Sequence, residues 1–134
     1  MLDFKKYFEE EYRYTLYNVD FKIIENEPGK ELTAQILDNI ETEIKENILY
    51  IKFVREVSFV PEAVFSLEVA FLVMLTIKDG MHDKVAEIDW KKELTEQPDN
   101  PYFSNVIART AGLIANISSS YGQMPLMTPP ILIK

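Results

Sequence analysis

The sequence contains no cysteine, a single histidine and only four glycines. Without cysteine, neither a disulfide framework nor a thiolate metal site can form. The glycines are not clustered, so there is no glycine-rich phosphate-binding loop. The histidine, His82, lies beside the turn Asp79-Gly80, and the sequence shows no partner group that would make it a catalytic base. We therefore expect that the protein is not an enzyme and that it uses neither a metal nor a cofactor.

Basic residues and long apolar runs are also scarce. Fourteen lysines and arginines stand against twenty-two acids, which gives a formal charge of -8. This negative charge disfavours nucleic acid or an anionic membrane as a partner and favours a basic one. The apolar run from Val69 to Leu75 has seven residues, too few to cross a bilayer. Residues 1–11 lack the apolar core of a signal peptide, so we expect a cytoplasmic protein.

The segment Phe65–Ile77 is the part of the chain around which we expect a single domain of residues 1–134 to form. Its first half alternates, with Phe65, Leu67, Val69 and Phe71 on one face and Ser66, Glu68 and Ala70 on the other. From Val69 to Leu75 both faces are apolar, so a strand here must be covered on both sides. A single helix cannot do this. We therefore expect a homo-oligomer, either a dimer or a tetramer.

Three further segments alternate with period two and predict strands. The first begins at Tyr12, and its alternation changes phase between Leu16 and Tyr17, which predicts a β-bulge. The second spans residues 32–44, has one polar face expected to be exposed to solvent, and shows an interruption at Asp38-Asn39. The third carries the inward set Leu49, Ile51, Phe53, Val57 and Phe59. Turns are predicted at Glu27-Pro28-Gly29-Lys30, Glu46-Asn47, Val60-Pro61-Glu62 and Lys78-Asp79-Gly80.

Helical spacing occurs in three places. Residues 1–11 are compatible with one or two amphipathic turns, and short turns are also compatible with residues 84–95, where the role of Trp90 is not assigned. Asn100 and Pro101 form a good helix start, and an amphipathic helix is predicted from there to the serine run at 118–120. Its inward set is Phe103, Val106, Ile107, Thr110, Leu113, Ile114 and Ile117. Residues 121–134 contain three prolines and must form an extended tail.

The order of these elements resembles that of the SecB family of protein-export chaperones. Phe65-Ser66-Leu67-Glu68-Val69 looks like the family's fourth-strand run, and Ala108-Arg109 looks like the alanine-arginine of its helix. Tyr121 falls on the family's phenylalanine, Gln123-Met124 and Leu126 resemble its glutamine-leucine and leucine, and Pro129 or Pro130 its following proline. The likeness covers roughly Tyr12 to Leu132. The chain departs from the family in its short connection between the first two strands and in the position of Trp90.

The resemblance implies an α+β fold, namely a four-stranded antiparallel sheet with one main helix packed on one face. It also implies an ATP-independent holdase that binds unfolded or export-bound polypeptides in apolar grooves. The implied peptide-binding residues are Phe65, Leu67, Val69, Phe71, Tyr121, Met124, Leu126 and Met127. Glu68, Glu41 and Glu43 are then expected to dock a basic segment, such as one of a SecA-type translocase.

Two alternatives stand beside this hypothesis. A SecB-like chaperone dedicated to a single partner, such as an antitoxin, would explain the departures from the family pattern. A non-catalytic structural or assembly module would have its apolar strand buried permanently by neighbouring subunits. The acidic segments are equally compatible with simple solvated faces, and the apolar tail with core packing.

Overall fold

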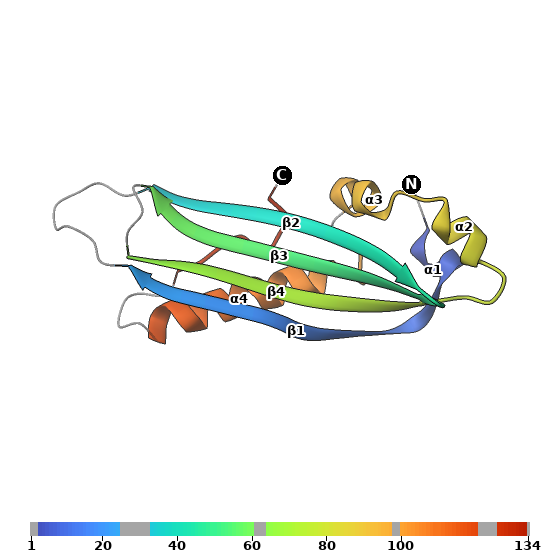
Figure 1. The fold of residues 1–134 in the computed structure, drawn as a ribbon, viewed down its shortest axis with the longest axis horizontal. Helices are drawn as coiled ribbons and strands as arrows, with labels where there is room; N and C mark the ends of the chain where they lie inside the picture. Colours follow the sequence, from blue (N-terminus) through green and yellow to red (C-terminus); the bar gives the residue numbers. More distant parts are fainter. Residues whose placement is uncertain (1–2, 25–32, 61–63, 98–99, 121–125, 134) are drawn as a thin grey trace.

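The fold is shown by a computed structural model (Figure 1), described here for residues 3–24, 33–60, 64–97, 100–120 and 126–133. Four antiparallel strands form one sheet in the order β1-β4-β3-β2. The strands are β1 (Phe8–Ile24), β2 (Thr33–Lys45), β3 (Ile48–Val60) and β4 (Val64–Ile77). The helices are α1 (Phe4–Tyr7), α2 (His82–Ala86), α3 (Trp90–Glu96) and α4 (Ser104–Ser120). The predicted α+β sheet with a main helix is confirmed.

Helix α4 lies behind the sheet in Figure 1 and packs across β4 and β3, whereas α1, α2 and α3 gather at one end. We call the α4 side of the sheet the inner face and the opposite side the outer face. Alternation sends every second residue of each strand to the inner face. On β3 these are Leu49, Ile51, Phe53, Arg55 and Val57, all buried. The core therefore lies between the inner face and α4.

Strand β1 contains the bulge that the sequence predicts. Leu16 pairs with Phe71 on β4, whereas Asn18 pairs with Ala70, so one extra residue is accommodated at Tyr17. The bulge keeps apolar side chains on the inner face on both sides of the phase change. The strand begins at Phe8, earlier than the Tyr12 start that alternation predicts, and only α1 before it is helical.

The remaining boundaries agree in part with the sequence patterns. The turn at Glu46-Asn47 is present, and Glu46 has a φ of 55°. The turn after β4 is also present, where Gly80 has a φ of 80° that a side chain would disfavour. The predicted turns at Glu27-Pro28-Gly29-Lys30 and Pro61-Glu62 lie outside the described residues. The predicted interruption of the second strand at Asp38-Asn39 is wrong, because β2 pairs with β3 without a break.

Helix α4 starts later than predicted. Asn100 caps a preceding turn instead, because its Oδ1 accepts from the backbone N–H of Tyr102 at 3.1 Å. Its backbone carbonyl accepts from the N–H groups of Phe103 and Ser104. On the helix itself Val106, Ile107, Thr110 and Ile114 are buried as predicted, but Leu113 and Ile117 are only partly buried at the margin of the core.

Trp90 anchors the cluster of short helices at the end of the sheet. Its ring lies 5.5 Å from that of Phe4 and 5.0 Å from that of Phe8, and its indole N–H donates to the carbonyl of Val85 at 2.9 Å. These contacts join α1, α2 and α3 to the start of β1, which gives Trp90 and Phe4 a structural role.

Candidate peptide-binding and docking surfaces

The four peptide-binding residues predicted on β4 lie together on the inner face. Phe65, Leu67, Val69 and Phe71 have exposed fractions of 3%, 1%, 0% and 8%. They are core residues in this chain, and their role in binding peptide stays a prediction. The alternation predicted the correct face for these residues but not that they are buried, because burial depends on the elements that cover that face.

An exposed apolar strip continues this face on the neighbouring strand. Leu16, Val19 and Ile23 of β1 pair with Phe71, Val69 and Phe65 of β4 respectively, so they point to the same side. Their exposed fractions are 47%, 39% and 62%. We call these three residues the β1 strip. Sequence reasoning placed them on a strand but did not assign them to a site, although three apolar residues on an edge strand were a usable signal.

The predicted tail residues have different environments. Leu126 packs partly buried against the core, and its backbone N–H donates to Oγ of Ser118 at 2.7 Å. Met127 is 77% exposed. Tyr121 and Met124 lie outside the described residues. The tail from residue 126 to 133 therefore lies on the inner face and presents Met127 outwards.

A buried ion pair that sequence reasoning missed fixes this tail. Arg55 on β3 and Asp38 on β2 are paired in register, and both side chains are fully buried. Nε and Nη2 of Arg55 donate to the two carboxylate oxygens of Asp38 at 2.7 and 2.8 Å. Both residues occupy inward positions of their strands, and two opposite charges at inward positions were the signal available in the sequence.

The arginine also holds the tail directly. Its Nη1 donates to Oγ1 of Thr128 at 3.0 Å and to the carbonyl of Pro129 at 2.6 Å, and Nη2 donates to the carbonyl of Ile131 at 2.9 Å. Asp38 accepts from the backbone N–H of Ile133 at 2.9 Å. The apparent break that the sequence pattern shows at Asp38 is therefore an attachment point for the tail.

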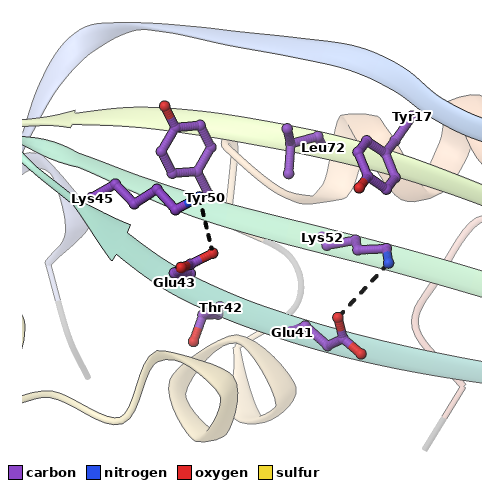
Figure 2. A pocket seen from close by; sticks show the side chains of 8 residues that line it. All are labelled: Tyr17, Glu41, Thr42, Glu43, Lys45, Tyr50, Lys52 and Leu72. Carbon is purple, nitrogen blue, oxygen red and sulfur yellow. Dashed lines mark ion pairs between the residues drawn. The ribbon is translucent and has the colours of Figure 1, made fainter.

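The predicted docking acids lie on the outer face in two groups. Figure 2 shows the first, a shallow hollow where Glu41 and Glu43 lie near Tyr17, Tyr50 and Leu72. Each of these acids is paired with a lysine, Glu41 with Lys52 at 3.9 Å and Glu43 with Lys45 at 3.8 Å. Because these groups are largely exposed, the pairs contribute little stability.

Glu68 belongs to the second group, a row of acids across three strands. It lies opposite Asp20 on β1 and opposite Glu56 on β3. Oε2 of Glu68 accepts from Nδ2 of Asn18 at 3.1 Å. Like charges directly opposite one another destabilise a sheet, so this row costs stability that a bound cationic group would recover. Docking at these acids stays a prediction.

Other kinds of site find no support in the described part of the chain. Within it, no three histidine or acidic side chains come together so as to hold a metal ion. None of its helices is long and apolar enough to span a membrane.

The architecture as a whole is a SecB-like fold. No family model matches the chain, and no curated protein matches it in sequence. Among solved structures it is similar to the Mycobacterium tuberculosis Rv1957 SecB-like chaperone in complex with a ChAD peptide from the Rv1956 HigA1 antitoxin. The TM-score is 0.58 and the identity 9%, and the match covers 89% of this chain and 88% of that chain. This likeness shows the fold.

Proposed function

We propose that this protein is an ATP-independent holdase that binds unfolded or export-bound polypeptides on apolar surfaces. The observation that supports this most is the β1 strip. Its three side chains are exposed on the inner face of an edge strand, beside the buried Phe65, Val69 and Phe71. Contiguous exposed apolar side chains of this kind usually mark a site of interaction with another chain.

An unfolded polypeptide meets the requirements of this surface. Its apolar side chains lose water when they pack on Leu16, Val19 or Ile23, and each such side chain supplies about 1.5–3 kcal/mol before ordering costs. Met127 adds a flexible, exposed thioether on the same face of the molecule. Several weak contacts on one chain combine through effective concentration, so firm holding requires no particular client sequence.

The edge of β1 is the surface we assign to self-association. The strand has seventeen residues and, within the part of the chain that the structure describes, pairs only with β4, whereas α3 contacts β2 at the other edge of the sheet. A second copy that pairs along β1 would use main-chain groups and leave the side chains of the strip exposed. The strips of two copies would then lie side by side and form a longer apolar floor for a client.

The outer face is the surface we assign to a basic partner. Glu41, Glu43 and Glu68 lie on it, and the row containing Glu68 has no lysine or arginine partner among the described residues. A SecA-type translocase or one dedicated protein would approach this face while the inner face holds the client. Electrostatic attraction of this type mainly raises the rate of association and depends on salt.

A chaperone dedicated to one partner is the second candidate. It is favoured by the structural likeness to a SecB-like chaperone that was solved with a peptide from an antitoxin. The two candidates differ in promiscuity. A general holdase suppresses aggregation of unrelated unfolded proteins, whereas a dedicated one co-purifies with a single partner and protects only that partner.

The test is light scattering of two unrelated, thermally unfolded model proteins with increasing amounts of the wild-type chain and no nucleotide. Suppression of both, near one oligomer per client, supports the general holdase. Protection of neither model protein, together with one stoichiometric partner in a pull-down from the native host, supports the dedicated chaperone. Absence of both would contradict a chaperone function.

A further inference from the structure

Arg55 has all five of its N–H donors occupied. Two go to the carboxylate of Asp38, and three go to the tail, at Thr128, Pro129 and Ile131. Asp38 in turn accepts from the backbone N–H of Ile133. In the described residues no buried side-chain nitrogen or oxygen lacks a hydrogen-bond partner. All of these donors therefore have protein partners only while the tail lies beside the pair.

The groups that the tail supplies are almost all main-chain groups. The carbonyls of Pro129 and Ile131 and the N–H of Ile133 belong to alternate residues of the tail, which bends at Pro130 and Ile131. The hydroxyl of Thr128 is the only side-chain group among them. Every polypeptide carries main-chain carbonyls and N–H groups, so the site is suited to recognise a backbone and not a particular sequence.

The side chains of the tail are only partly used. Thr128 and Leu132 are buried, whereas Met127 and Ile131 are 77% and 66% exposed. A buried ion pair is in itself weak support for stability, since well-packed apolar residues in its place are often as stable. The arrangement is better explained as a ligand site. Without the tail, Arg55 would have three N–H donors without protein partners, and the carbonyls of another chain can accept from them.

We propose that Arg55 and Asp38 form a main-chain clamp for polypeptide, and that residues 126–133 occupy it as an internal ligand that a client segment displaces. This inference rests on the proposed function, because it assigns a second contact to the same client. The tail then sets a threshold for binding, since a client must compete with a segment that is always present.

The experiment uses the full chain and, as probe, a fluorescent synthetic peptide of residues 126–134. Leu132→Ala weakens the internal tail by removing a buried side chain, and Ile131→Ala is the matched control because its side chain is exposed and its carbonyl is retained. Anisotropy titration should show the Leu132→Ala chain binding the peptide about tenfold more tightly than wild type. The Ile131→Ala chain should match wild type.

A second variant tests the clamp itself. Arg55→Met combined with Asp38→Leu and Leu132→Ala removes the polar groups that bind the main chain of residues 129–133. The gain in peptide affinity should then disappear in a chain whose far-ultraviolet circular dichroism is retained. Equal affinities of the Leu132→Ala, Ile131→Ala and wild-type chains would overturn the proposal, because the tail would then be a fixed part of the core.

Aggregation suppression by the same variants separates this inference from the proposed function. Suppression that persists when Leu132→Ala gains no peptide affinity leaves the holdase intact and overturns the clamp. Tighter peptide binding without any suppression leaves the clamp intact and overturns the holdase.

Discussion

Arg55 and Asp38 face each other in register across β3 and β2, and two hydrogen bonds of 2.7 and 2.8 Å join the guanidinium to the carboxylate. Neither side chain is exposed. The pair lies on the inner face, where the strands otherwise carry apolar residues such as Phe53 and Val57. It links the second half of the sheet to the last described residues of the chain, so its removal should affect both.

Removing one partner of this pair should cost far more than removing both. Asp38→Ala leaves a buried guanidinium without its counter-charge, and we expect it to lower the free energy of unfolding by about 3–5 kcal/mol. Arg55→Met with Asp38→Leu leaves no buried charge and should cost much less. Urea midpoints of the two variants provide the comparison, and a double variant as unstable as Asp38→Ala would contradict the expectation.

Reversing the charge of Glu68 should leave the fold intact. Glu68→Lys removes repulsion from Asp20 and Glu56 but loses the hydrogen bond from Asn18. The net change in stability should stay within about 1 kcal/mol. Binding of a fluorescent lysine-rich peptide should weaken at low salt and be equal to wild type at high salt. Global unfolding of the variant would show that Glu68 is structural and would end the docking hypothesis.

The hydroxyl of Tyr102 should make stability fall at alkaline pH. Burial raises its pKa above the ordinary value of 10.0, and the negative charges of Glu10 and Asp3 raise it further. The unfolded chain then loses this proton at a lower pH than the folded chain does. The contribution is fully present below the unfolded pKa and is lost as pH rises through the folded pKa.

The measurement is the urea midpoint of wild type and Tyr102→Phe at about pH 8 and about pH 11. The phenylalanine variant should lose less stability between the two conditions, because it has no proton to release. An identical loss in both chains would mean that Tyr102 ionises equally in the folded and unfolded states.

Self-association should depend on the edge of β1. We expect light scattering at micromolar concentration to give a mass above the 15.6 kDa of one chain. Val19→Lys places a charge on the inner face of the edge strand, a substitution that disfavours pairing between edges, and it should shift the mass towards one chain. A wild-type mass of one chain at every concentration would contradict the oligomer.

The sequence predicted the elements that depend on local pattern. Alternation located the strands, and the phase change at Leu16-Tyr17 located the bulge, because side chains must stay on one face of a sheet. The turn at Gly80 followed from backbone preference. These features require only neighbouring residues, which a single sequence contains.

Features that join distant parts of the chain were not predicted. The attachment of Thr128 to Arg55 spans the strands and the helix, and no local pattern reports it. The break at Asp38 was wrongly predicted for the same reason. A charged residue at an inward position can be interpreted only once its partner, here Arg55, is known. Likewise, Phe65 and Ile23 share a face, yet the first is buried and the second exposed, a difference that no local pattern reports.

The central claim is that the β1 strip holds unfolded polypeptide, and one comparison of variants tests it most directly. Leu16→Ser with Ile23→Ser removes apolar surface from the strip. Leu37→Ser is the matched control, because Leu37 is 60% exposed, close to the 62% of Ile23, but points to the outer face. For wild type and for both variants, the measurement is the concentration of the chain that halves light scattering of a thermally unfolded model protein.

The strip variant should require about tenfold more protein than wild type, a factor that corresponds to a net loss of about 1.4 kcal/mol once the ordering costs of the two lost contacts are subtracted. The Leu37→Ser chain should perform as wild type does. Equal suppression by all three chains, each with an unchanged urea midpoint, would contradict the account and place client binding elsewhere on the molecule.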